Sequence, residues 1–415
     1  MTVLAMNGGT KVRTAPWPAV GRRFGKEELQ QLKEALEQNT LFYIYGQKTK
    51  RLCARMATVC GAKHVVACSS GSAAVHGAVK ACGVGPGDEV ITSTITDAGT
   101  ILGVVYEGAI PVFADIDPTS YNITAESIEE RMSKRTKAVI LVHLAGVPAD
   151  VKPIVRLCKR RGVKLIEDCA QSWGAMVDEQ WIGTFGDVGT FSLNDYKHLS
   201  AGEGGLIVTD DAGLYATAWR AIDKCYDRLT GTRDVLFVAP NYRITELQSA
   251  VAIAQLGKLK HIISTRHRLG DRLTKGLKGI PGIATHKVAK GGYATYWFYL
   301  IGLDTDALGV DARTFGKALN AEGIAGSGNF YMRPVHLEYS YLRRQTAFHH
   351  SRYPFTLARK GISYEKGSCP NAERMPGAVY YFPLNEWLSN REIDDTVAAV
   401  SKVAGYFREQ KHHGA

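Results

Sequence analysis

Between residues 60 and 210, short apolar runs alternate with stretches whose apolar positions recur at helical spacing. In the segment 73–82, Ala74, Ala78 and Val79 fall on one helical face, and the Gly/Pro-rich turn 83–87 ends it. Strands alternating with helices predict a mostly parallel sheet covered on both faces, with ligands beyond the carboxyl ends of its strands. The runs typical of buried strands are 65–67, 89–91, 110–113, 138–142 and 164–166.

The pattern changes after residue 245. Residues 245–278 form a long amphipathic stretch that is poor in capping signals, and we expect one helix that joins two domains. A strand-like run follows at 294–303, and the segments 311–322 and 391–407 have helical periodicity. The chain is therefore predicted to have a large domain over residues 1–265 and a smaller α+β domain over residues 266–415.

Composition narrows the class of protein. The chain has 415 residues, is 45% hydrophobic and carries a formal charge of +11, so it is not mainly disordered. No stretch reaches the roughly 18 consecutive apolar residues of a membrane span. The N-terminus lacks the pattern of a signal peptide, so a cytoplasmic protein without a membrane partner is expected. The basic residues are spread along the chain without a dense patch, so nucleic acid is not an expected partner.

The eight cysteines contain no Cys-x-x-Cys pair. This spacing argues against a metal site and against a disulfide framework. We therefore expect reduced, mostly buried thiols and no bound metal.

Three segments carry candidate chemistry. The small-residue turn 68–74 precedes a helix, whose N-terminal amides and the Ser72 hydroxyl suit an anion. The strand 164–166 leads into an acid, Asp168, and Lys197 lies in a glycine-bounded loop where partial burial would lower its pKa. Each feature is common by itself, because many turns consist of small residues, many strands end in an acidic residue and most lysines lie at the surface. Their order matches the needs of a pyridoxal phosphate enzyme: a phosphate cradle, a carboxylate for the pyridine nitrogen and a Schiff-base lysine.

These segments resemble the DegT/DnrJ/EryC1/StrS family of sugar and cyclitol aminotransferases, a branch of the fold-type I pyridoxal phosphate enzymes. The resemblance runs from the Gly8-Gly9 opening to the segment 369–373. It implies an α/β fold with a large domain around a mostly parallel seven-stranded sheet and a smaller C-terminal α+β domain. It also implies a homodimer with shared active sites. The motifs that carry the resemblance are 70–74, 85–91, 167–171, 191–197 with 202–205, and 241–244.

The resemblance also implies roles for individual residues. Lys197 would form the Schiff base and shuttle the α-proton, Asp168 would pair with the pyridinium nitrogen, and Gln171 would hydrogen-bond the ring's 3-oxygen. The residues implied to hold the phosphate are Gly71, Ser72, Ala73, Ser192 and, from a second subunit, Asn241.

One position departs from the family. Asp97 stands where an aromatic side chain usually stacks on the pyridine ring, and a carboxylate cannot stack. Either another group covers the ring, or Asp97 contacts cofactor or substrate differently, or the local register is shifted. Tyr43, Tyr45 and His336 match positions near the substrate, where contact with substrate and ordinary packing are equally expected.

The implied reaction is transfer of an amino group from glutamate or glutamine to a keto-sugar or keto-cyclitol, through the pyridoxamine form of the cofactor. Amino-sugar or antibiotic biosynthesis is the expected setting. The first alternative is a sugar dehydratase or other diverted chemistry, although the dehydratases that resemble this chain have histidine in place of Lys197. The second is a catalytically silent regulator or nucleic-acid-binding protein. The sequence leaves open the keto substrate, the aminated carbon, the donor and the stereochemistry.

Overall fold

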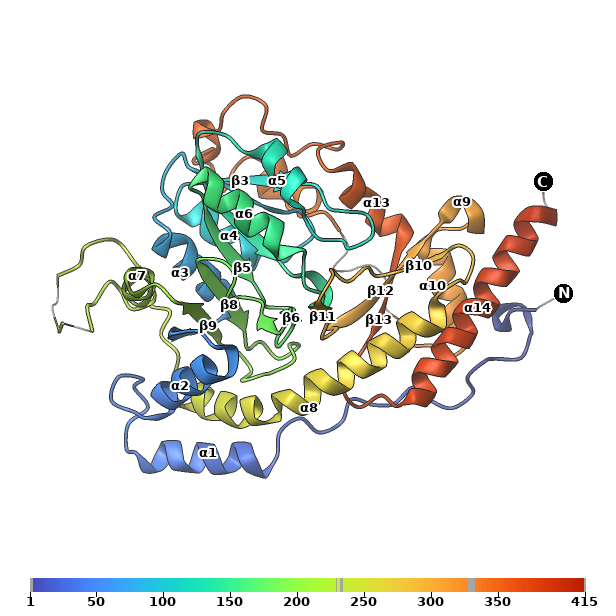
Figure 1. The fold of residues 1–415 in the computed structure, drawn as a ribbon, viewed down its shortest axis with the longest axis horizontal. Helices are drawn as coiled ribbons and strands as arrows, with labels where there is room; N and C mark the ends of the chain where they lie inside the picture. The colour runs from blue at the N-terminus through green and yellow to red at the C-terminus, as the bar shows by residue number, and fades with distance from the viewer. Residues whose placement is uncertain (1–2, 229, 232–233, 327–332, 414–415) are drawn as a thin grey trace.

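The computed structural model describes residues 3–228, 230–231, 234–326 and 333–413 (Figure 1). A seven-stranded sheet with the order β1-β9-β8-β5-β4-β2-β3 forms its centre. Only β9 runs antiparallel to its neighbours β1 and β8, which confirms the predicted mostly parallel sheet. The strands are β1 (His64–Cys68), β2 (Glu89–Ser93), β3 (Ile110–Ala114), β4 (Thr136–Val142), β5 (Lys164–Asp168), β8 (Val188–Ser192) and β9 (Gly205–Thr209).

Both faces of this sheet are buried. Along β4, Val139 and Leu141 pack into one apolar cluster, while Ala138 and Ile140 pack into a second one. Successive strand residues point to opposite faces, so an uninterrupted apolar run fills both layers. The associated helices are α2 (Lys48–Cys60), α3 (Gly71–Ala81), α4 (Gly99–Tyr106), α5 (Ala125–Arg131), α6 (Val151–Arg161) and α7 (Ala212–Ile222).

The predicted long helix is α8 (Glu246–Leu277), which runs beneath both parts of the molecule in Figure 1 and packs against α1 (Lys26–Glu37). Its start is capped, contrary to the expectation of a cap-poor stretch. The Thr245 hydroxyl accepts a hydrogen bond from the Gln248 amide, and the Gln248 side chain accepts one from the Thr245 amide. This Thr-x-x-Gln pattern is a capping box, a signal the sequence contains.

The C-terminal part is built on a three-stranded antiparallel sheet with the order β10-β12-β13. The strand predicted at 294–303 begins only at Phe298, because Thr295 and Trp297 donate their amides to Gly146 and Ala145 instead of to a neighbouring strand. The elements of this part are β10 (Ile283–Thr285), β12 (Phe298–Leu303), α9 (Thr305–Leu308), α10 (Ala312–Ala321), α11 (Val335–Glu338), α12 (Ser340–Arg344), α13 (Pro370–Ala378), β13 (Val379–Pro383) and α14 (Asn390–His413).

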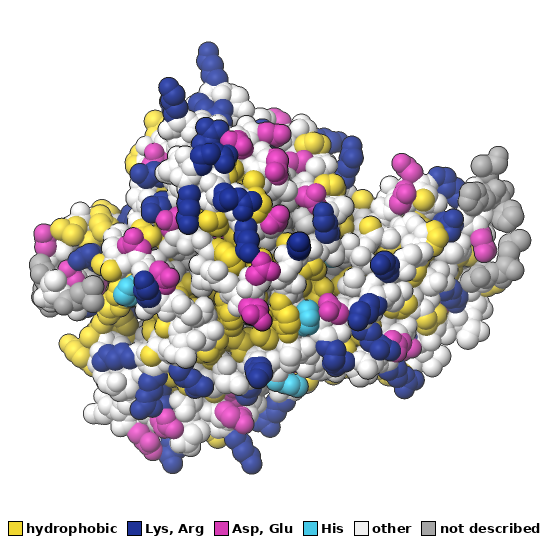
Figure 2. Space-filling view, viewed as in Figure 1, with side chains coloured by type: hydrophobic (Ala, Val, Ile, Leu, Met, Phe, Trp, Pro, Cys, Tyr) yellow, Lys and Arg dark blue, Asp and Glu magenta, His cyan; other side chains and the backbone are white. Residues whose placement is uncertain are grey.

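A small third sheet joins the two parts. It contains β6 (Met176–Val177), β7 (Gln180–Trp181) and β11 (Gly292–Tyr293). None of the described helices combines the length and apolar character needed to span a bilayer. The eight cysteines are free thiols and seven of them are buried. Lysine and arginine side chains are scattered over the face shown in Figure 2 and are interspersed with acidic ones.

Candidate active site

A cavity of about 230 Å³ lies beyond the carboxyl ends of the parallel strands. Its walls come from the segments that follow β1, β2, β5 and β8, four separate parts of the sequence. This is where an open α/β sheet places its ligand site. The cavity is lined by seven of the residues that the sequence predicted: Gly71, Ser72, Asp97, Asp168, Gln171, Ser192 and Lys197.

The N-terminus of α3 forms one end of the cavity. The Ser70 hydroxyl caps the helix by accepting a hydrogen bond from the Ala73 amide (3.1 Å), so this amide is already engaged. A Cβ at Gly71 would lie 2.6 Å from the Ser192 Cβ, closer than side-chain atoms approach each other. Glycine therefore lets β8 come close to the helix start, where the Ser72 and Ser192 hydroxyls and the helix dipole suit a phosphate.

Asp168 ends β5 with only 5% of its surface exposed. The Thr100 hydroxyl donates to its Oδ2 (2.8 Å), and the Ala170 amide donates to its Oδ1 (3.1 Å). Because Thr100 gives its proton to Asp168, the Thr96 hydroxyl, 2.6 Å from that of Thr100, must donate to Thr100. Burial raises the pKa of Asp168, opposed by these hydrogen bonds and by the charge of Lys197. A buried carboxylate of this kind suits a cationic nitrogen as partner.

Lys197 faces the same cavity from the loop after β8. Its Nζ lies 3.8 Å from the centre of the Trp297 ring, and the Trp297 indole donates to the carbonyl of Tyr196 (2.6 Å). Burial lowers the pKa of Lys197 to about 8, against the opposing charges of Asp168 and Asp97. Much more of this amine is neutral at neutral pH than in an exposed lysine, as a nucleophilic amine requires.

Gln171 and Asp97 complete the predicted lining. The Gln171 carbonyl oxygen accepts the Ala145 amide (2.9 Å), which leaves the amide nitrogen as the donor for a ligand. Asp97 is exposed, and its Oδ1 accepts the Gly99 amide (2.9 Å) at the start of α4. The carboxylate at position 97 therefore borders the cavity while it also supports a helix start.

Five other predicted residues do not line this cavity, and one of them is Ala73, whose amide is bonded to Ser70. Asn241 pairs with Asp223 in an isolated backbone bridge, and the buried Tyr43 donates its hydroxyl to the Asp223 carboxylate (2.5 Å). The Tyr45 side chain is 72% exposed. His336 is fully buried, with ring nitrogens 2.5 Å from the Thr94 hydroxyl and 3.2 Å from a Glu373 oxygen.

Sequence reasoning missed several residues of this site. Thr100 holds Asp168, and Trp297 lies against Lys197. Thr100 lies far from Asp168 in the sequence, and Trp297 lies one hundred residues after Lys197, so no local motif predicts either contact. Their only signal would be proximity in the fold.

The donor set fits pyridoxal phosphate. A depressed-pKa amine matches the aldehyde, a buried carboxylate matches the pyridine nitrogen, and a helix start with two serine hydroxyls matches the phosphate. The tight Gly71–Ser192 approach forms the cradle. Lys197, Asp168, Gln171, Ser72 and Ser192 would hold the cofactor.

A neighbouring cluster of residues that could bind a metal already uses its side chains in hydrogen bonds within the protein. His143, Glu167 and Cys169 bring their donor atoms within 4.8 Å of one another. Glu167 accepts the amides of residues 183, 185 and 186 and the His143 Nε2–H (3.0 Å). The other His143 nitrogen accepts the Ala149 amide (3.1 Å), so its ring is a neutral tautomer that positions the end of β5.

Comparisons with known proteins agree with this geometry. Residues 22–401 match the model of the DegT/DnrJ/EryC1/StrS aminotransferase family. A putative L-glutamine:3-amino-2,3-dideoxy-scyllo-inosose aminotransferase of Micromonospora echinospora is 31% identical, with 96% of each chain covered. A UDP-N-acetyl-3-dehydro-alpha-D-glucosamine 3-aminotransferase of Acidithiobacillus ferrooxidans is 35% identical over 85% of this chain and 87% of its own.

A solved aminotransferase structure is also similar to this chain. The aminotransferase TlmJ from Streptoalloteichus hindustanus superposes with a TM-score of 0.78 at 27% identity, covering 92% of this chain and 97% of its own. The family match spans most of the chain, and the relatives are aminotransferases rather than regulators or nucleic-acid-binding proteins. The chain therefore belongs to the DegT/DnrJ/EryC1/StrS aminotransferase family and is a pyridoxal phosphate-dependent aminotransferase.

Proposed function

We propose that this enzyme transfers an amino group from glutamate or glutamine to a keto-sugar or keto-cyclitol in amino-sugar biosynthesis. The observation that carries the proposal is the buried Lys197 amine, with its lowered pKa, in one cavity with Asp168. The names of the two curated relatives support the substrate class, since one refers to an inosose and the other to a dehydro-glucosamine.

The residues divide the work by their chemistry. The bound cofactor would supply an electron sink and alternate between its pyridoxal and pyridoxamine forms. Lys197 would anchor the cofactor and, once displaced, carry a proton at its Nζ to and from the substrate carbon. Asp168 would keep the pyridine nitrogen protonated, and the Gln171 amide would donate to the ring oxygen. Ser72, Ser192 and the N-terminus of α3 would bind the phosphate.

We further propose that two chains form a dimer and that Asn241 serves the site of the partner subunit. Asn241 does not line the cavity of its own chain. It lies instead beside Asp223, which binds Arg228 and Arg243 in a buried ion-pair cluster. This cluster would hold the strand-like segment 241–244 rigidly enough to present a side chain to a second chain.

The absorption spectrum of the purified holoenzyme tests the proposed reaction. Adding glutamate or glutamine should convert the visible band of the lysine-bound cofactor to the near-ultraviolet band of the amine form, and adding a keto-sugar should restore it. Lys197→Ala should abolish the starting band, whereas Lys63→Ala, at an exposed lysine outside the cavity, should keep it. A band that no amino donor changes would contradict the proposed transamination.

Subunit mixing tests the shared site. Lys197→Ala and Asn241→Ala homodimers should each have little activity, while random exchange of their subunits should restore about a quarter of the wild-type sites. This recovery arises because half of the dimers are mixed and each mixed dimer has one intact site. No recovery, despite proven subunit exchange, would place Asn241 outside the partner's site.

A further inference from the structure

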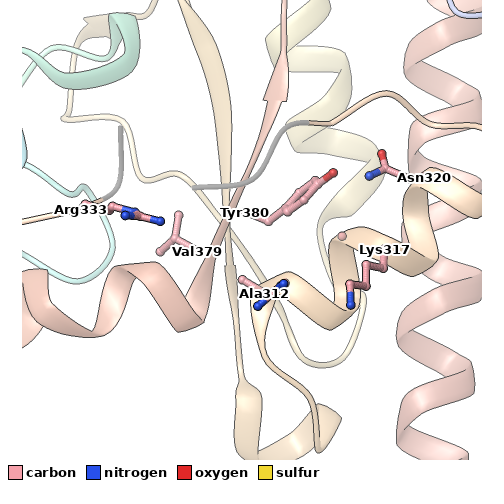
Figure 3. A pocket seen from close by; sticks show the side chains of 8 residues that line it. Ala312, Lys317, Asn320, Arg333, Val379 and Tyr380 are labelled. Atoms are coloured by element: carbon pink, nitrogen blue, oxygen red, sulfur yellow. The ribbon is translucent and has the colours of Figure 1, made fainter. Parts of the chain in front are cut away.

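A second, larger cavity of about 550 Å³ lies in the C-terminal part of the chain. One face of α10 forms one wall, and Val379 and Tyr380 of β13 form another, with Arg333 at its side (Figure 3). None of its described lining residues also lines the catalytic cavity. The mechanism proposed above makes no use of this cavity.

The lining of this cavity is basic. Arg313 and Lys317 are four residues apart on α10 and therefore project from the same helical face. Arg333 adds a third cation from a different segment, and no carboxylate occurs among the described lining residues. Arg333 also contacts Glu338 at 3.3 Å, but both side chains are about half exposed, so this pair is weak and can be exchanged for a ligand.

Tyr380 provides a second, independent observation. Its side chain is 4% exposed, and its hydroxyl has no hydrogen-bond partner among the described residues. Burial raises the pKa of Tyr380, so the hydroxyl keeps its proton and is a donor. A buried donor without an acceptor is unfavourable, and an oxyanion in the cavity would supply that acceptor.

Two glycines make room for this tyrosine. A Cβ at Gly316 would lie 2.4 Å from a Tyr380 ring carbon, and one at Gly326 would lie 1.7 Å from the Tyr380 hydroxyl oxygen. Any larger residue at either position would displace the ring. In Figure 3 the ring lies between Arg333 on one side and Asn320 on the other.

We propose that this cavity binds a phosphoryl group of a small molecule. Arg313, Lys317 and Arg333 supply the charge for a dianion, and guanidinium groups match phosphate oxygens geometrically. Tyr380 donates a hydrogen bond, and the cavity is large enough for a phosphate that carries an organic group. The phosphoryl group belongs either to the acceptor substrate of the proposed function or to a separate effector.

The site has a physical connection to the catalytic cavity. Arg333 lies two residues before Val335, whose amide donates to the carbonyl of Thr94 (2.8 Å). Thr94 in turn lies two residues before Thr96, which lines the catalytic cavity and hydrogen-bonds Thr100. Occupancy of the basic cavity can therefore influence the segment that supports Asp168.

Binding of inorganic phosphate and of uridine monophosphate to the holoenzyme tests the proposal, because bound cofactor blocks the other phosphate site. Calorimetry at low ionic strength should detect binding of one or both probes to the wild type. The double variant Arg313→Gln/Lys317→Gln should bind at least about tenfold more weakly, and Tyr380→Phe, which changes no charge, should also bind more weakly. Equal melting temperatures would show that the variants are folded.

The matched control is Arg156→Gln/Lys275→Gln, which removes the same charges from exposed positions outside the described cavities. It should leave binding unchanged. Absence of binding of both probes to the wild type, or an equal loss in this control, would overturn the proposal. These measurements need no turnover, so they are independent of whether the proposed transamination is correct.

Kinetics then distinguish the two sources of the phosphoryl group. If it belongs to the acceptor, the cavity variants should raise the KM for a phosphorylated keto-sugar and leave the half-reaction with the amino donor unchanged. If it belongs to an effector, added phosphate should change the donor half-reaction of the wild type and not that of the Arg313→Gln/Lys317→Gln variant. Phosphate binding without either kinetic effect would overturn the functional role of the cavity.

Discussion

The burial of Lys197 determines the direction in which its titration is shifted. Burial lowers the pKa of this amine from 10.5 to about 8, against the opposing charges of Asp168 and Asp97. At pH 7 an amine with this pKa is roughly 9% neutral, whereas an ordinary lysine is about 0.03% neutral, a difference of about 300-fold. In the proposed role of Lys197, the neutral amine is the form that would react with the cofactor aldehyde, so the rate of cofactor binding should rise with pH and level off above about pH 8.

Stopped-flow absorption of cofactor-free enzyme mixed with pyridoxal phosphate measures this rate between pH 6 and 10. Reaction with N-acetyl-lysine under the same conditions corrects for the titration of the cofactor itself. Asp97→Asn removes a carboxylate that stabilises the cation, so the midpoint should move to lower pH. The movement should be modest, since Asp97 is exposed and water screens its charge.

Glu203→Gln is the matched control, because it removes the same charge from the cavity lining at a carboxylate that is bonded to Asn194 (2.9 Å). Its midpoint should stay close to that of the wild type. A wild-type midpoint near pH 10 would refute the inference that Lys197 is desolvated. A midpoint that rises in Asp97→Asn would refute the assigned sign of the Asp97 contribution.

Three further outcomes follow from the structure. Thr100→Val removes the hydrogen bond to Asp168, and a bond to a charged group contributes about 1.5–3 kcal/mol, so cofactor binding should weaken by roughly tenfold to a hundredfold. Thr100→Ser keeps the hydroxyl and should keep the affinity. Fluorescence titration with the cofactor measures both. Gly71→Ala should reduce cofactor affinity in the same titration because its Cβ would lie 2.6 Å from the nearest side-chain carbon, whereas Gly85→Ala, with no atom within 4 Å, should not. Asp223→Asn should lower the free energy of unfolding by about 3–5 kcal/mol at pH 7, since two arginines would lose their buried anion. Burial opposes the shift, but hydrogen bonds lower the pKa of Asp223 below its ordinary value of 3.8. This stabilisation is therefore present above that value and is lost as pH falls below it, so denaturant unfolding at about pH 3 should show a smaller difference than at pH 7.

Much of the fold was predictable because its signals are local. The strands ended within two residues of the predicted runs at β1, β2 and β3, since an apolar run bounded by turns determines where a buried strand can lie. The three chemical segments were also found in the sequence, and the structure brings them to one cavity. Parallel strands with right-handed crossovers place their carboxyl ends at one edge of the sheet, so this convergence follows from the topology.

Contacts between distant segments could not be predicted in this way. The run 294–303 is strand-like throughout, yet its first four residues lie outside the strand, two of them bonded to the loop after β4. Tyr43 was a candidate for substrate contact, and the fold gives its hydroxyl to Asp223, 180 residues away. A side chain's partners depend on which segments pack against it, and local periodicity carries no information about that.

By itself, the sequence determined the α/β class, the order of the elements and the segments that carry Lys197, Asp168 and the small-residue turn before α3, because backbone periodicity and turn chemistry act over a few residues. Only the tertiary structure decided that Thr100 donates to Asp168 and that Trp297 covers the Lys197 amine. It alone also produced the basic cavity beside Tyr380. Burial, desolvation and hydrogen-bond pairing depend on non-local packing, and these three quantities set the pKa of a catalytic group.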